Sequence, residues 1–184
     1  MRDLKLANNK LTHLDESIGT LTNLELLDIH NNAITALPES LIEMVKLRTI
    51  NISENKLVSI PFKSLSKLPL VELLAAKNCL SGVLVDEEVQ ELSNLQMLDI
   101  TGNSITKLSE STTLALPLLQ TLECSANRIE GLPNMSSWTQ VVTLIADDNK
   151  ISSIPEGFTS LSKVRNVDLT GNDIRNLDNR IGEM

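Results

Sequence analysis

Aromatic residues are nearly absent from this chain of 184 residues. Two Phe, one Trp and no Tyr make up 2% of the sequence, although hydrophobic residues reach 41%. An irregular globular core uses large aromatic side chains to fill its volume, whereas a stack of similar layers can be filled by repeated Leu, Ile and Val. The scarcity of aromatic residues therefore favours a repetitive architecture.

The chain also lacks the motifs of catalysis. It has two Cys and two His, in no arrangement with metal-ligand spacing. It contains neither a Gly-rich phosphate loop nor a G-x-S-x-G motif. The sequence therefore predicts no catalytic residue, no metal site and no cofactor.

Long apolar runs and an excess of positive charge are missing too. No run approaches the ~18 residues of a membrane span. Against 24 Asp and Glu there are 16 Lys and Arg, which gives a net charge of −8. Negative charge repels nucleic acid and anionic membranes, so we expect neither as a partner.

One motif recurs through the whole chain. Residues 95–105 read L-x-x-L-x-L-x-x-N-x-L, with Ile in two of the Leu positions. The same place in successive copies is held by eight asparagines: Asn9, Asn32, Asn55, Asn78, Asn103, Asn127, Asn149 and Asn172. Their spacings are 23, 23, 23, 25, 24, 22 and 23 residues. A period in the twenties with this motif is typical of a leucine-rich repeat solenoid.

The chain resembles the leucine-rich repeat family over essentially its whole length. The resemblance implies an α/β solenoid, a right-handed superhelix shaped as an arc or horseshoe. Its parallel β-sheet would form the concave face, and 3₁₀ or short α-helices would form the convex face. We expect one domain over residues 1–184, with eight repeats that begin near residues 1, 24, 47, 70, 95, 119, 141 and 164. Neither end has the polar cap that closes a solenoid, so we expect a segment of a longer chain. The alternative is that the first and last units are themselves caps.

The crossovers between strands carry their own signals. Proline follows the same apolar position in several repeats, as Pro38, Pro61, Pro133 and Pro155. Because proline keeps the preceding residue out of helical conformation, and the following segments are short, we expect 3₁₀ turns or one to two turns of α-helix there. The best helix candidate spans residues 85–92 in the irregular fourth repeat, where Asp86 can cap the first turn.

The resemblance assigns a structural role to the eight motif asparagines. In this family the asparagine side chain points inward and bonds backbone groups of its own and neighbouring loops, as a ladder. A buried backbone donor without a partner costs ~1–3 kcal/mol, so such a ladder stabilises the stack.

A binding site is expected on the concave face. Side chains alternate along a strand, so the residues between core positions line this face in four columns. The columns hold nine acids against two bases, Lys5 and Lys77, and their negative field favours a basic partner. The residue after the motif asparagine is often basic, as at Lys10, Lys56, Arg128 and Lys150, and the competing interpretation is that this basic edge balances part of the acidic charge. The candidate partner-binding residues are Leu26, Asp28, His30, Glu72, Leu74, Met97, Asp99, Thr101, Glu123, Ile145, Asp147 and Asp168.

Two features of that face have competing interpretations. Leu74 and Met97 lie in adjacent repeats, and an exposed apolar pair within a charged rim resembles a protein-binding hot spot. Scattered exposed apolar residues are, however, ordinary. His30 near Asp28 has the composition of a general base, but we interpret it as a solvated residue of the sheet.

The predicted function is a non-catalytic scaffold or adaptor that binds a basic protein on its acidic concave face. The L-P-x-x-L crossovers, the period near 23 and the lack of Cys-rich caps resemble the intracellular leucine-rich repeats of Ras-signalling scaffolds. Cys79 and Cys124 lie two repeats apart, roughly 10 Å, beyond the ~7 Å that a disulfide spans between Cα atoms. A reduced, cytoplasmic protein is therefore expected.

Two alternatives remain open. The first is an extracellular recognition domain, such as a receptor ectodomain fragment. The second is the regulatory repeat segment of a larger enzyme. The first alternative draws on two glycosylation tripeptides, Asn51-Ile52-Ser53 and Asn134-Met135-Ser136. We interpret both as chance matches in a repeat rich in Asn and Ser.

Overall fold

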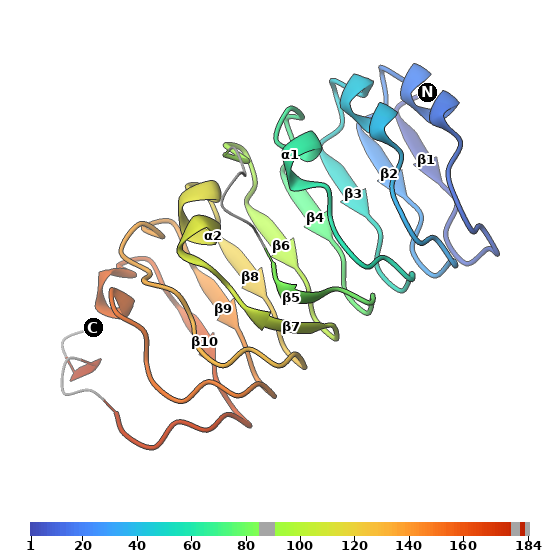
Figure 1. The fold of residues 1–184 in the computed structure, drawn as a ribbon. Helices are drawn as coiled ribbons and strands as arrows, with labels where there is room; N and C mark the ends of the chain where they lie inside the picture. Colours follow the sequence, from blue (N-terminus) through green and yellow to red (C-terminus); the bar gives the residue numbers. More distant parts are fainter. Residues whose placement is uncertain (85–90, 178–180, 183–184) are drawn as a thin grey trace.

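A computed structural model describes residues 1–84, 91–177 and 181–182. The chain folds as an arc of stacked repeats, each of which contributes one strand to a parallel sheet of eight strands (Figure 1). The order in the sheet is β1-β2-β3-β4-β6-β8-β9-β10. These strands span Asp3–Lys5, Leu26–Asp28, Thr49–Asn51, Glu72–Leu74, Met97–Asp99, Thr121–Glu123, Thr143–Ile145 and Asn166–Asp168.

Each of these strands is short, and its middle residue makes the core contact. Leu27, Ile50 and Leu98 are examples, each with an exposed fraction of 0%. The strands pair in register, so that Leu27 lies between Leu4 and Ile50. Equivalent residues of successive repeats therefore form straight columns across the sheet, as the motif predicts.

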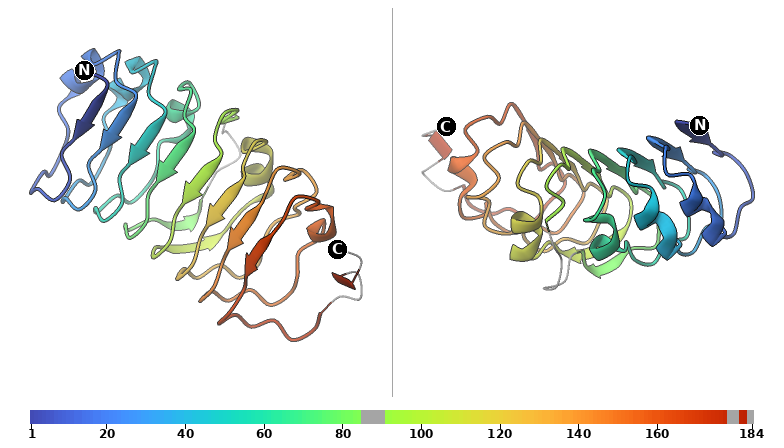
Figure 2. Two further views of the ribbon diagram at one scale, coloured as in Figure 1. Left: turned by 180° about the vertical axis from the view of Figure 1, so that it is seen from behind. Right: turned by 90° about the horizontal axis from the view of Figure 1, so that it is seen from above.

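The outer side of the arc carries short helices rather than a continuous layer. The 3₁₀ helices are η1 (Glu16–Thr20), η2 (Glu39–Glu43) and η3 (Phe158–Ser160), and the α-helices are α1 (Phe62–Leu65) and α2 (Glu110–Ala115). Pro38 and Pro61 directly precede η2 and α1, so short helices follow these crossover prolines as expected. Seen from above in Figure 2, the strands lie on the concave side and the helices on the convex side.

The fourth repeat departs from the others. Its segment Ser81–Val83 (β5) pairs with Ser104–Lys107 (β7) of the next repeat in a separate two-stranded parallel sheet, which the motif does not predict. Of the helix predicted over residues 85–92, residues 85–90 lie outside the described part of the chain, and Glu91 and Leu92 are not helical. The longest described helix is α2, in the repeat that follows.

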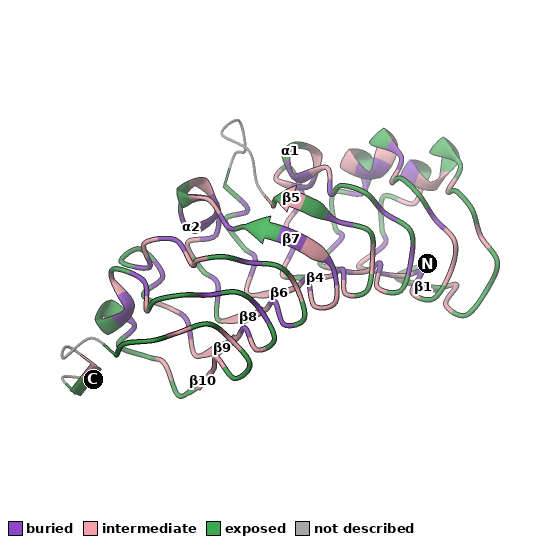
Figure 3. Ribbon diagram, turned by 60° about the horizontal axis from the view of Figure 1, so that its bottom comes forward, coloured by how far each residue is buried: buried purple, intermediate pink, exposed green. Residues whose placement is uncertain are grey.

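The hydrophobic core lies between the sheet and the outer segments and runs along the arc (Figure 3). Repeated Leu and Ile side chains fill most of it. Trp138 and Phe158 are also buried in it. Cys124 is buried, Cys79 is exposed, and both are free thiols.

Candidate functional site

The concave face consists of four columns of side chains. The first and third residues of each strand form two columns, in which Asp99, for example, lies beside Glu123. The residues two and three positions after each strand form the other two. None of the described helices covers this face (Figure 2), so the sheet is open along its length.

The residues of the fourth column form a left-handed turn after each strand. Its residues, all with φ between 51° and 69°, are Asn8, Asn31, Glu54, Lys77, Gly102, Ala126, Asp148 and Gly171. Left-handed backbone favours Gly and tolerates Asn and Asp, and these types occupy most of the column. That enrichment is a sequence signal for the turn, and the repeat motif alone does not capture it. The turn directs the next residue, the motif asparagine, into the solenoid.

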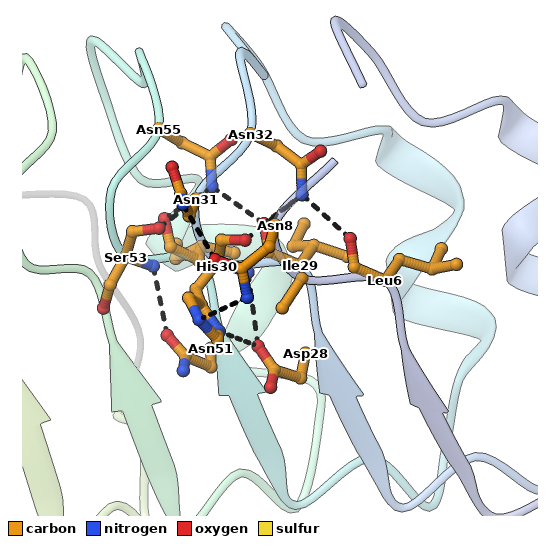
Figure 4. Close-up of polar contacts among 12 residues, drawn as sticks. Leu6, Asn8, Asp28, Ile29, His30, Asn31, Asn32, Asn51, Ser53 and Asn55 are labelled. Atoms are coloured by element: carbon orange, nitrogen blue, oxygen red, sulfur yellow. Dashed lines mark hydrogen bonds and ion pairs between the residues drawn. The ribbon is translucent and has the colours of Figure 1, made fainter. Parts of the chain in front are cut away.

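The motif asparagines join each repeat to the one before it (Figure 4). Asn32 Nδ2 donates to the Leu6 and Ile29 carbonyls, both at 3.0 Å, and Asn32 Oδ1 accepts from Leu11 N at 2.9 Å. The equivalent three bonds recur at Asn55, Asn78, Asn103, Asn127, Asn149 and Asn172. Asn9 donates to two carbonyls of its own loop. The ladder therefore holds the columns of the concave face at a fixed spacing.

Several acids of the second column also bond the backbone of their own repeat. Asp99 Oδ1 accepts from Thr101 N at 2.9 Å, and Asp168 Oδ1 accepts from Thr170 N at 2.9 Å. The hydrogen bonds from Thr170 lower the pKa of Asp168, which keeps this carboxylate ionised. Each of these acids therefore supports a turn as well as contributing charge to the face.

His30 lies against Asp28, in the same arrangement. Its Nδ1 is 2.8 Å from Asp28 Oδ1, and its Nε2 is 3.5 Å from Asn8 Nδ2 (Figure 4). The ring is half-buried and held by its neighbours, rather than simply solvated as we expected. Its hydrogen bonds within the described chain include no hydroxyl or thiol, so no nucleophile is paired with it.

The charge of the face is partly compensated in the first half, and the columns of the second half contain no base. In the first four repeats, Glu54 pairs with Lys77 at 2.8 Å, and this contact lowers the pKa of Glu54 and raises the pKa of Lys77. In the last four repeats, no acid of the four columns forms an ion pair with a basic residue of the described chain. These acids are Asp99, Glu123, Asp147, Asp148 and Asp168.

Glu123 is the least favourably placed of these acids. Partial burial raises the pKa of Glu123, and the neighbouring carboxylate of Asp99 raises it further. Asp147 accepts a hydrogen bond from the Ser125 hydroxyl. Beneath them, burial raises the pKa of the Cys124 thiol to about 12, so this thiol is an inert core residue.

The candidate apolar residues of the face are less exposed than the sequence implies. Leu26, Leu74, Met97 and Ile145 are all half-buried, because neighbouring columns cover part of each side chain. Of the other candidates, Glu72 is exposed and accepts from Thr49 Oγ1 at 3.3 Å.

More strongly exposed apolar side chains lie outside the concave face. Val58 and Val83 are 66% and 52% exposed. They border a cavity of about 270 Å³ whose lining includes Ile60, Phe62 and Leu80. The repeat motif does not predict this cavity, since it arises at the irregular fourth repeat.

The structure describes residues 1–84, 91–177 and 181–182. These residues contain no group of three or more His, Cys, Asp or Glu side chains placed to hold a metal ion. Within the same ranges, no helix is long and apolar enough to cross a membrane.

The stacked repeats and the uncovered parallel sheet define a solenoid protein. The sequence model of the leucine-rich repeat family matches residues 1–57 and 22–80, and solved leucine-rich repeat structures superpose on nearly all of the chain. The chain therefore has the leucine-rich repeat fold, and its first 80 residues carry the sequence pattern of that family. A comparison with curated protein sequences gives no match.

Three solved structures illustrate the similarity. Internalin C2 of Listeria monocytogenes is 28% identical with a TM-score of 0.75, over 95% of this chain and 73% of that one. A leucine-rich repeat protein of Leptospira interrogans is 25% identical with a TM-score of 0.75, over 98% of this chain and 51% of that one. This chain thus spans about half of the Leptospira protein.

The third similar structure is a complex. A chain in the octameric assembly of latrophilin 3, Unc5D and the FLRT2 leucine-rich repeats is 25% identical with a TM-score of 0.83, over 99% of this chain and 57% of that one. Leucine-rich repeat proteins bind other proteins, and this chain has the architecture of such a protein-binding module.

Proposed function

We propose that this chain is a non-catalytic scaffold or adaptor whose concave face binds a basic protein. The observation that carries the proposal is the uncovered eight-stranded sheet, whose four columns hold nine acids against two bases. Complementary charge steers a partner to such a face and fixes its orientation. The asparagine ladder supports the proposal too, because a surface held rigid before binding loses little conformational entropy on binding.

We propose that the protein is cytoplasmic. Its two thiols are unpaired, one of them exposed, and free cysteines are typical of reducing compartments.

The alternative, an extracellular recognition domain, draws on Asn134. Asn134 Oδ1 accepts from Ser136 N at 2.9 Å and from Ser136 Oγ at 2.7 Å, in a glycosylation tripeptide at the surface. The intact mass of the chain secreted from eukaryotic cells distinguishes the cytoplasmic proposal from the extracellular alternative. Extra mass from a glycan that disappears in Asn134→Gln favours the extracellular alternative.

Affinity capture with a charge-reversal variant tests the proposal. The variant carries Asp99→Lys, Glu123→Lys and Asp168→Lys on the concave face. The matched control carries Glu39→Lys, Glu43→Lys and Glu130→Lys, three exposed acids outside that face, and so has the same net charge. We expect the wild type and the control to recover the same basic proteins and the concave variant to lose them. Equal recovery by both variants would show that the acidic face is not the binding site.

A further inference from the structure

The acidity of the concave face is concentrated at one end. In the first four repeats the four columns hold four acids against two bases, and Asp28 and Glu54 contact His30 and Lys77, each at 2.8 Å. In the last four repeats they hold five acids and no base. The part of the sheet face whose columns hold acids and no base therefore spans β6, β8, β9 and β10, and Arg128 and Lys150 follow the motif asparagines at its edge.

The acids of this half form a row across the strands. Asp99 pairs in register with Glu123, Glu123 with Ile145, and Ile145 with Asp168. Asp147 lies two residues after Ile145 and supplies the acid of that repeat. Successive repeats thus present one carboxylate each in the second or third column, at steps of ~4.8 Å between neighbouring strands.

One apolar side chain, Ile145, lies in this row, and another, Met97, lies beside it in the first column. Both side chains are half-buried. The first column continues from Met97 with Thr121 in β8 and Thr143 in β9. Lys and Arg bury their aliphatic stems along such apolar surface while their charged ends reach carboxylates. The surface therefore complements long basic side chains in both shape and charge.

The arrangement also works against the fold. Glu123 is partly buried beside Asp99, with no base of the described chain to offset the two charges, and its pKa is raised in consequence. Like charges held together in the native state are a common property of binding sites. A cation placed over Glu123 would remove this repulsion.

We propose that a basic α-helix of a partner protein docks along β6, β8, β9 and β10, with one Lys or Arg per turn facing the acid row. This inference rests on the proposed function and narrows it to one half of the face and one kind of occupant. A helix advances ~5.4 Å per turn, against ~4.8 Å per repeat, so the mismatch over four repeats stays within the reach of a flexible side chain. An extended segment advances ~6.6 Å for every second residue and matches the row less well.

Two isosteric variants of the full chain test which half binds. The first removes four charges from the last four repeats, with Asp99→Asn, Glu123→Gln, Asp147→Asn and Asp168→Asn. The second removes four from the first four repeats, with Asp3→Asn, Asp28→Asn, Glu54→Gln and Glu72→Gln. Asn and Gln keep the hydrogen-bond acceptors of the turns, and circular dichroism melts check that both variants fold.

Two synthetic peptides of about 16 residues test the occupant by calorimetric titration. Both have the same composition and helicity. One places Lys at i, i+4, i+7 and i+11, on a single helical face, and the other distributes the same four Lys around the helix.

The proposal predicts that the single-face peptide binds the wild type more tightly than its isomer. It predicts that the first variant lowers this affinity roughly tenfold or more, since each charge contact contributes up to a few-fold. The second variant should change the affinity less than threefold.

Equal loss of affinity in both variants, or greater loss in the second, overturns the placement in the last four repeats but leaves the acidic face as the site. Equal binding of the two peptides overturns the helical occupant. Unchanged affinity in both variants overturns this inference and the proposed function together.

Discussion

At Asn103 one side chain serves the backbone of two repeats. Its Nδ2 donates to the Ala75 carbonyl at 3.1 Å and to the Ile100 carbonyl at 2.8 Å, and its Oδ1 accepts from Asn78 N and Leu80 N, both at 3.1 Å. The residue is only 9% exposed, so water has little access to these groups. An apolar side chain of similar size would leave several backbone groups buried without partners.

We therefore predict that Asn103→Leu lowers the free energy of unfolding by roughly 2–5 kcal/mol, because each buried unpaired group costs ~1–3 kcal/mol. Urea denaturation followed by circular dichroism measures the change. Asn9→Leu is the matched control, since Asn9 is exposed and bonds only its own loop. An Asn103→Leu midpoint as high as that of Asn9→Leu would contradict the structural role of the ladder at this repeat.

A second prediction at this scale concerns Glu123. Its pKa is raised in the folded chain, so ionisation of Glu123 disfavours the fold. Glu123→Gln should therefore raise the melting temperature at pH 7. The gain should shrink as the pH falls through the raised pKa, and it should vanish once the carboxyl is protonated in both the folded and the unfolded state.

Glu54→Gln is the control of opposite sign. Lys77 lowers the pKa of Glu54, so the ionised form stabilises the fold. The variant should melt lower than the wild type at pH 7, and the difference should be lost as the pH falls through the lowered pKa. Melting curves from pH 7 down to about pH 2 cover the titration of both carboxyls. A loss of stability in Glu123→Gln at pH 7 would refute the repulsion assigned to that site.

At the scale of the element, the unit is a short strand followed by a left-handed turn. The strand is too short to be stable by itself, and its position depends on the turn that sends the motif asparagine inward. Glu54, Lys77 and Ala126 adopt left-handed φ values of 56°, 53° and 51°, which cost a residue with a Cβ roughly 1–2 kcal/mol. Hydrogen bonds between repeats offset this cost.

Ala126 offers the cleanest test of that cost, because its side chain is exposed and its methyl group makes no hydrogen bond. We predict that Ala126→Gly raises the free energy of unfolding by about 0.5–1 kcal/mol. The substitution removes the strain of the left-handed turn, and the greater conformational entropy of Gly in the unfolded chain offsets part of that gain. The converse change, Gly102→Ala at φ 69°, should destabilise, since its Cβ would lie 3.2 Å from Lys77 Cγ. Chemical denaturation measures both, and a destabilising Ala126→Gly would contradict the cost assigned to the turn.

The elements also show where sequence reasoning works and where it stops. The strands of the main sheet follow from the apolar alternation and the fixed distance to the next asparagine, as at Leu98 and Asn103. The strand pair β5–β7 does not follow from this pattern, because it includes Gly82 at φ 73° and depends on the longer fourth repeat. Helix α2 is equally hidden, since its sequence E-S-T-T-L-A has no apolar period. Its buried Thr113 is accommodated by a hydrogen bond from its hydroxyl to the Glu110 carbonyl at 2.8 Å.

The candidate site is predictable to a similar extent. The columns, and with them the excess of acids, can be read from the motif because the register is constant. The burial of Leu74 and Met97 cannot be read from the motif, since it depends on the size of the side chains in adjacent columns. The pairing of Glu54 with Lys77 likewise depends on side-chain conformations that the motif does not specify.

At the scale of the whole molecule, the ladder, the turns and the core combine into a stiff arc with one open face. Its net charge of −8 is displayed unevenly, and the last four repeats hold acids that no base of the described chain neutralises. The central claim is that a basic protein binds to this face.

Carboxylate labelling tests that claim most directly. The wild-type chain is treated with a carbodiimide and an amine, alone and in complex with the basic protein that it captures, and the labelled sites are located by mass spectrometry. We predict slower labelling of Asp99, Glu123, Asp147 and Asp168 in the complex and unchanged labelling of Glu39, Glu43 and Glu130. Protection of the second group, with the first labelled as fast as in the chain alone, would contradict it.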